Sequence, residues 1–84
     1  MNIAFFGSSL TSAYWNGAAT YYRGIIRALD ARSHRITFYE PDAYNRQQHR
    51  DLEENPPWCR VLVYPAQNED AVYAALEQAR AADL

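Results

Sequence analysis

Three short apolar runs, separated by segments of helical character, constrain the fold of this chain more than any other feature. The runs are residues 2–6, 35–40 and 60–64, and they are short enough to be strands buried in a parallel sheet. Amphipathic helical patterns follow the first run and the third. Because parallel strands need right-handed crossovers through the intervening helices, the sequence predicts an α/β fold with a parallel sheet.

The first helix is expected to begin at Ala18, with Asn16 as its N-cap, and to end near Arg32 and Ser33. Its inward face carries Ala18, Tyr22, Ile25, Ile26 and Leu29, and its outer face carries Arg23, Arg27 and Asp30. Glycine is the favoured residue for the left-handed position that closes a helix. Ser33 is a poorer choice there, so we expect strain or fraying at this end.

The second half of the chain predicts two further helices. Residues 43–52 are polar and indicate a short helix, which the segment 53–57 with its two prolines would end. A last helix is expected to begin at Asn68 or Glu69. Its inward residues would be Val72, Ala75, Leu76 and Ala79.

The predicted fold class is a truncated Rossmann-like unit. In a doubly wound sheet the first strand is central, with the second and third strands on one side and the fourth on the other. The chain reaches Leu84 where a fourth strand would be expected to begin. Residues 1–84 therefore predict one partial domain, a three-layer sandwich with a three-stranded parallel sheet. Its first strand would lie at an open edge, which favours a homodimer or the exchange of elements between chains.

Composition argues against several partner classes. The net charge is −2 and the eight basic residues are all arginines scattered along the chain, so no nucleic-acid partner is expected. The single Cys59 has no partner for a disulfide or a metal site, so no metal is expected and the cytoplasm is the simplest compartment. No cofactor is expected either. The apolar run at 3–6 is too short for a signal peptide or a membrane span.

The loop of residues 7–17 is the first candidate binding site. It connects a strand to the amino terminus of a helix, where free backbone N–H groups and the helix dipole attract anions. Long loops at the carboxyl ends of parallel strands usually bind ligands. The candidate residues are Gly7, Ser8, Ser9, Asn16 and Gly17. The alternative is an ordinary polar loop that needs one glycine for its turn.

The loop lacks the dinucleotide-binding fingerprint. A G-x-G-x-x-G pattern that began at Gly7 would need glycine at the positions of Ser9 and Ser12. Glu40 ends the second strand, where a ribose-binding acid would lie, but we interpret it as a strand-end residue that faces solvent or the cleft. The sequence also lacks a nucleophile elbow, so Ser8 is a poor candidate for covalent catalysis.

Residues 44–51 form a second candidate site at the same carboxyl edge of the sheet. Arg46 and Arg50 are four residues apart, so a helix would align them on one face that could hold a phosphate or a carboxylate. A solvated helix face explains this pattern equally well. His49 could act as a general base, whereas His34, between a helix and a strand, is expected to be structural.

Four segments carry a family resemblance: IAFFGSSL at 3–10, SAYWNGAATYYRG at 12–24, FYEPDAY at 38–44 and RQQHRD at 46–51. With them the chain resembles the amino-terminal end of bacterial CgeB-like proteins, also labelled spore maturation proteins and described as glycosyltransferases of the GT-B type. The resemblance implies a parent with two Rossmann-like domains that face a cleft. It also implies that the carboxyl-terminal domain holds most nucleotide-sugar contacts. Asn16 and Gly17 match the glycine-containing loop of the amino-terminal domain, with Ser8 and Ser9 at its base.

The function implied is the acceptor-side portion of a glycosyltransferase, which moves a sugar from a nucleotide-sugar donor to an unidentified acceptor and is inactive as this fragment. Five residues would line its cleft: Gly7, Ser8, Ser9, Asn16 and Gly17. Arg46 and His49 would lie on the acceptor side. Two alternatives remain: a small nucleotide- or phosphate-binding module, and a structural fragment that acts by self-association.

Overall fold

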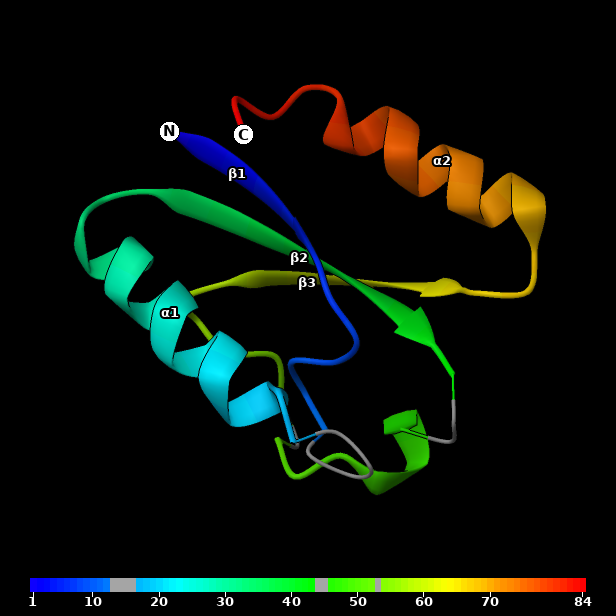
Figure 1. Cartoon of the computed structure of the whole chain (residues 1–84), viewed down its shortest axis with the longest axis horizontal. Helices are drawn as coiled ribbons and strands as arrows, with labels where there is room; N and C mark the ends of the chain where they lie inside the picture. Colours follow the sequence, from blue (N-terminus) through cyan, green and yellow to red (C-terminus); the bar gives the residue numbers. More distant parts are fainter. Residues whose placement is uncertain (13–16, 44–45, 53) are drawn as a thin grey trace.

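The structure is a computed structural model that describes residues 1–12, 17–43, 46–52 and 54–84 (Figure 1). Its elements are β1 (Asn2–Phe6), α1 (Ala19–Ala31), β2 (Arg35–Asp42), the 3-10 turn η1 (Arg46–His49), β3 (Arg60–Pro65) and α2 (Glu69–Ala79). The three strands form one parallel sheet in the order β1-β2-β3. This confirms the predicted α/β fold of truncated Rossmann-like type.

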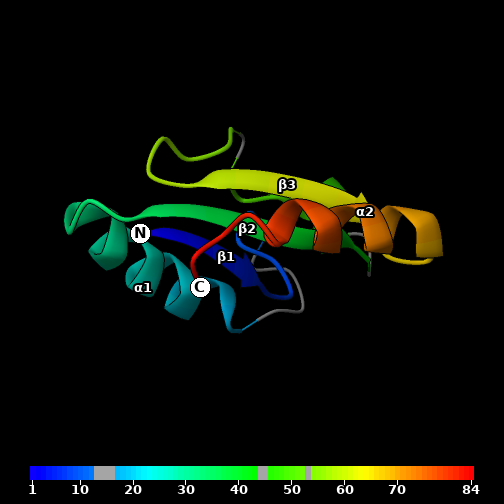
Figure 2. The ribbon, with the colours of Figure 1, turned by 90° about the horizontal axis from the view of Figure 1, so that it is seen from above.

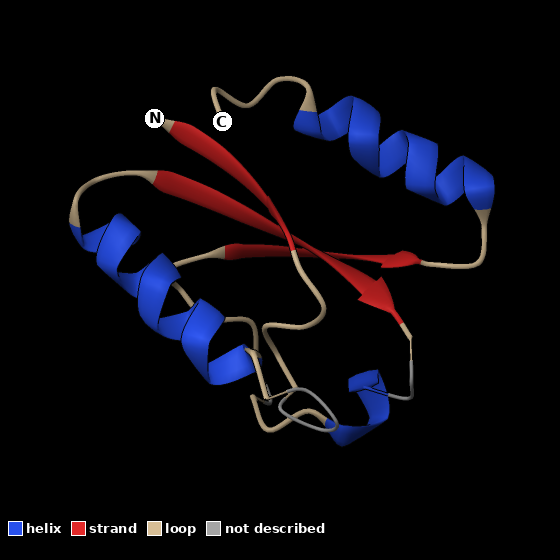
Figure 3. Ribbon diagram, in the orientation of Figure 1, coloured by secondary structure: helices blue, strands red, loops and turns tan. Residues whose placement is uncertain are grey.

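The two helices lie on opposite faces of the sheet and give three layers (Figures 2 and 3). The core fills the space between the sheet and α1, where Phe38 and Ile26 are fully buried. Phe5 is paired with Phe38 across the two strands, and their rings stack at a centroid separation of 5.4 Å. The core therefore depends on strand pairing that brings large rings side by side. Neither helix is long and apolar enough to cross a bilayer.

Helix α1 follows the predicted pattern on its inward face, with Ile26 buried and Tyr22, Ile25 and Leu29 half-buried. Its first helical residue is Ala19, one residue later than expected. Ala18 takes the N-cap position and provides no side-chain cap, whereas the predicted cap, Asn16, lies outside the described residues.

Helix α2 begins as predicted, because the side chain of Asn68 accepts a hydrogen bond from the backbone N–H of Ala71 at 3.1 Å. The prediction that Leu76 faces inward is wrong, since 46% of it is exposed. Ala75, which was also predicted to face inward, is buried, so α2 rests on the sheet along a narrow strip of its surface. The contacts of α2 with the sheet are mainly to β3, which leaves the flank that carries Leu76 uncovered.

The predicted short helix over 43–52 is reduced to the single turn η1. Tertiary contacts explain the difference, because residues after His49 are held by other parts of the chain. The N–H of Leu52 donates to the carbonyl of Thr11 at 3.2 Å, and Asp51 pairs with Arg23. The turn ends before Arg50, so the helix face expected to align Arg46 with Arg50 does not form.

The carboxyl-terminal residues lie along the outer side of β1. Leu84 accepts from the N–H of Ala4 at 2.8 Å and donates to the carbonyl of Asn2 at 3.3 Å, which is the pair of bonds of a parallel bridge. The carboxylate of Asp83 also accepts from the backbone N–H of Asn2 at 2.8 Å. β1 is thus the edge strand of the three, as predicted, but the tail covers its amino-terminal half. Self-association through this edge stays a prediction.

Ser33 adopts the left-handed conformation expected at the end of α1, with φ of 68°. Its N–H donates to the carbonyl of Asp30 at 2.9 Å, which closes the last turn. A side chain crowds the backbone in this region, and glycine avoids the cost. The predicted strain at this helix end is located at this residue.

We expect Ser33→Gly to raise the free energy of unfolding by about 1 kcal/mol, because glycine removes the left-handed penalty. Urea denaturation followed by circular dichroism would measure the change. Arg32→Gly is the matched control, since φ of Arg32 is −96° and glycine there only adds chain entropy to the unfolded state. Equal effects of the two substitutions would show that Ser33 is not strained.

Candidate functional site

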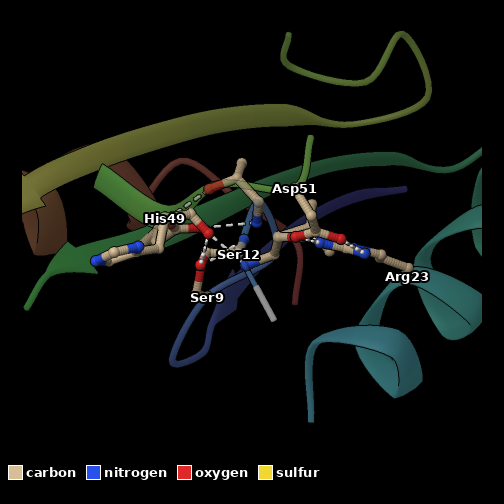
Figure 4. Close-up of polar contacts among 8 residues, drawn as sticks. Ser9, Ser12, Arg23, His49 and Asp51 are labelled. Atoms are coloured by element: carbon tan, nitrogen blue, oxygen red, sulfur yellow. Dashed lines mark hydrogen bonds and ion pairs between the residues drawn. The ribbon is translucent and has the colours of Figure 1, made fainter. Parts of the chain in front are cut away.

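Two predicted segments meet at the carboxyl edge of the sheet, as the sequence led us to expect (Figure 4). The loop after β1 contacts the segment after β2 at two points. The hydroxyl of Ser12 donates to the carbonyl of His49 at 2.8 Å. The N–H of Leu52 donates to the carbonyl of Thr11 at 3.2 Å. The structure therefore combines the two candidate sites into one region.

Glu40 holds this region together from the end of β2. It is fully buried, and one carboxylate oxygen accepts from the backbone N–H groups of Leu10 at 2.7 Å and Thr11 at 3.2 Å. The other oxygen accepts from the Thr11 hydroxyl at 2.9 Å and from the side-chain amide of Gln47. The expectation that Glu40 faces solvent or the cleft is therefore wrong. A charged group tolerates burial when hydrogen bonds replace its water, and these donors do so.

Arg23 braces the same loop from α1. Its Nε donates to the carbonyl of Leu10 at 2.7 Å, and its two terminal nitrogens donate to the carboxylate of Asp51, both at 2.8 Å. The Arg23 side chain is 17% exposed, although the helical pattern placed it on the outer face. Sequence spacing could not reveal this bidentate pair, because its members are 28 residues apart. The pair anchors the segment after η1 to the helix.

The predicted serines lie at the base of the loop. Ser9 is fully buried, and its hydroxyl accepts from the backbone N–H of Ser12 at 3.1 Å (Figure 4). Ser8 is half-buried. The Ser9 hydroxyl thus contributes to the internal hydrogen bonding that shapes the loop.

The two predicted glycines have different surroundings. A Cβ at Gly7 would lie 2.6 Å from Cζ of Phe38 and 3.2 Å from Cε2 of Tyr22, so only glycine fits against these rings. Gly17 is exposed, and a Cβ there would meet nothing within 4 Å. The packing requirement at Gly7 was not visible in the sequence, where it was interpreted only as part of a ligand loop. Asn16, the neighbour of Gly17, lies outside the described residues.

The acceptor-side candidates belong to η1. His49 ends the turn with an exposed side chain whose ring points away from Ser12 (Figure 4). Arg46 begins the turn. By contrast, Nδ1 of His34 lies 3.2 Å from the amino group of Met1 at the other end of the sheet, in agreement with a structural role.

The amino terminus of α1 lies close to the loop after β1 (Figure 1). Among the described residues it has no side-chain cap, and its first turn carries no acidic residue. Its positive dipole end is therefore not neutralised by these groups and would attract an anion.

An aromatic row that sequence reasoning missed lies across the carboxyl half of the sheet. Phe6 ends β1, is 43% exposed and stacks on Tyr39 at 4.6 Å with 9° between the ring planes. Tyr64 lies at the end of β3 with its ring 6.4 Å from that of Phe6. The apolar run at 2–6 predicted a buried strand, and the exposed ring of Phe6 departs from that prediction. Such a ring, backed by the buried Tyr39, offers a flat apolar surface.

The described residues offer little for metal or thiol chemistry. Among them, no three His, Cys, Asp or Glu side chains gather in a way that could hold a metal ion. Burial raises the pKa of the Cys59 thiol to about 11, so the thiol stays protonated at neutral pH and is a poor nucleophile.

We expect Glu40→Gln to lower the free energy of unfolding by about 3 kcal/mol, because the new amide group faces donors and leaves them unpaired in a buried place. Amide hydrogen exchange at Leu10 and Thr11 should become faster. Asp42→Asn is the matched control, an exposed acid two residues further along the same strand, with a change within about 0.5 kcal/mol. Similar changes in the free energy of unfolding for both variants would show that the Glu40 hydrogen bonds do not stabilise this region.

Gly7→Ala should cost about 1–3 kcal/mol, since the added methyl group overlaps the ring of Phe38 and the core must shift. Gly17→Ala is its matched control, and open space around Gly17 predicts a change within about 0.5 kcal/mol. Thermal unfolding of the two variants would measure the difference. A tolerated alanine at position 7 would contradict the close packing described here.

Comparison of the chain with known protein families, with curated proteins and with solved structures finds no match.

Proposed function

We propose that this chain is the amino-terminal, acceptor-side portion of a cytoplasmic GT-B-type glycosyltransferase. The parent would move a sugar from a nucleotide-sugar donor to an acceptor, and residues 1–84 alone would not catalyse the transfer. The sequence resemblance to CgeB-like proteins suggests this function. The observation that carries it is the position of β1 between β2 on one side and the parallel-bridged tail on the other.

The tail pairing supports the proposal through the topology of doubly wound sheets. In such sheets the fourth strand lies on the side of the first strand opposite to the second. Leu84 makes its two bonds to β1 on that side and in the parallel direction. A strand that continued this pairing would make β1 central and would place a switch point at its carboxyl end. The loop after Phe6 begins there, where doubly wound proteins bind their ligands.

The chemistry of the carboxyl edge also supports an acceptor site. The exposed ring of Phe6 could stack on the apolar face of a sugar, and Tyr39 behind it would keep that ring in place. The exposed imidazole of His49 could accept a proton from an acceptor hydroxyl. The Glu40 hydrogen bonds would hold the loop and η1 in a fixed relation while the acceptor binds.

A small nucleotide- or phosphate-binding module is the second candidate. The amino terminus of α1 favours it, because its first turn carries no acidic residue and that end attracts phosphate without a second domain. The third candidate is a fragment that acts by self-association. It is supported by the exposed carboxyl-terminal end of β1 at Phe6, where a second chain could pair.

Ligand-observed NMR on the chain would separate these candidates. One panel would contain simple glycosides as acceptor analogues, and the other would contain nucleotides and nucleotide sugars. The proposal predicts weak binding of glycosides and none of the nucleotide panel, since the donor site would lie on the second domain. His49→Ala should weaken glycoside binding, whereas Arg32→Ala, an exposed residue at the end of α1, should not.

The other outcomes each favour a different candidate. Nucleotide binding would overturn the acceptor-side proposal and favour the binding module. If neither panel bound and the chain formed dimers at high concentration, self-association would be the better explanation.

A further inference from the structure

A groove of about 610 Å³ runs across the amino-terminal part of the sheet and reaches as far as Tyr39 of β2. It is lined by the first residues of all three strands and by the end of α2. Its size falls in the range that holds small organic ligands. The groove takes no part in the proposed transfer of a sugar.

Two arginines line the groove side by side. Arg35 and Arg60 are the first residues of β2 and β3. The strand register pairs Arg60 with Thr37, so Arg35 is the diagonal neighbour of Arg60 on the same face of the sheet. Both side chains carry a positive charge on the same face of the sheet, so an anion bound between them would be attracted by both.

Neither guanidinium has a protein partner within the described part of the chain. Each described ion pair uses another arginine: Arg23 pairs with Asp51, and Arg80 pairs with Glu77. Arg35 and Arg60 are exposed, so their planar forks are available to a ligand. A guanidinium fork matches the geometry of a phosphate and can donate two hydrogen bonds to it.

The other polar side chains of the groove are suited to the same ligand. Asn2, Thr37 and Gln78 line it and can donate hydrogen bonds from amide or hydroxyl groups. Asp30 of α1 is the one acidic residue among the described lining, so the two arginines outnumber it in the groove. The carboxylate of Asp83 lies nearby and accepts from the backbone N–H of Asn2.

We infer that this groove is a binding site for a phosphate group, held between the guanidiniums of Arg35 and Arg60. Asn2, Thr37 and Gln78 donate further hydrogen bonds to its oxygens. The two arginines come together only when β2 and β3 pair, so phosphate binds the folded state and stabilises the fold.

Titration with inorganic phosphate tests the inference, with sodium chloride used to hold the ionic strength constant. Backbone amide shifts at residues 35–37 and 60–61 should saturate, and the melting temperature should rise. Arg35→Gln and Arg60→Gln should each weaken binding by about tenfold or more, through the loss of charge-assisted hydrogen bonds. Arg35→Lys keeps the charge without the fork and should weaken binding less than Arg35→Gln.

Arg32→Gln is the matched control, because Arg32 is an exposed arginine outside the groove. Its affinity for phosphate should equal that of the unchanged chain. Three results would overturn the proposal: equal weakening by this control, no effect of the two groove variants, or shifts that never saturate. Each would mean that phosphate binds here as an adventitious ion only. Circular dichroism would confirm that each variant is folded.

A second titration, with glycerol 3-phosphate, distinguishes the source of the phosphate group. Tighter binding than inorganic phosphate would assign the groove to a phosphate ester, and equal binding would assign it to the free anion. These shifts arise at the amino ends of the strands, whereas glycoside binding would shift residues 6–12 and 46–52. The two proposals therefore succeed or fail separately.

Discussion

The buried carboxylate of Glu40 is the interaction on which the carboxyl edge of this protein depends. Its two oxygens accept from donors on both sides: the backbone of Leu10 and Thr11 after β1, and the side chain of Gln47 in η1. A buried charge without these partners would be costly, and these loop N–H groups would otherwise need water. The Glu40 side chain thus provides acceptors for the loop N–H groups, and these groups in turn stabilise its buried charge. It fixes the loop and the turn relative to the end of β2.

Around this carboxylate, the arginine–aspartate pair and the packing at Gly7 complete a rigid frame. Arg23 connects α1 to Asp51 and to the loop carbonyl of Leu10. Gly7 lets the chain pass directly over the ring of Phe38. With the backbone held in this way, Phe6 and His49 are exposed at the same edge. That combination of a hydrogen-bonded base and exposed groups is the physical basis of the proposed acceptor site.

The two ends of the sheet differ in chemistry. The carboxyl end combines a buried network with the amino terminus of α1. The amino end carries two arginines beside a groove, and neither has a protein partner among the described residues. Strand register produces the second arrangement, since Arg35 and Arg60 are 25 positions apart in sequence and become neighbours only when β2 and β3 pair. Parallel pairing therefore creates a positively charged feature that local sequence patterns do not contain.

Local patterns in the sequence determined the elements of this fold. The apolar runs became the three strands, Asn68 capped α2, and Ser33 took the left-handed position that ends α1. These outcomes follow from backbone preferences and side-chain periodicity, which act over a few residues. The parallel order of the strands also followed, because right-handed crossovers leave few topologies.

Only the tertiary structure decided what depends on distant contacts. Glu40 is buried because two loops bring donors to it, and Arg23 is drawn inward by Asp51. The helix expected after β2 shrank to one turn, since contacts with the loop after β1 hold the residues that follow. Leu76 stays exposed because α2 touches the sheet along a narrow strip. Hydrogen bonds and packing between residues far apart in the chain have no periodic signature in the sequence, so only the folded chain reveals them.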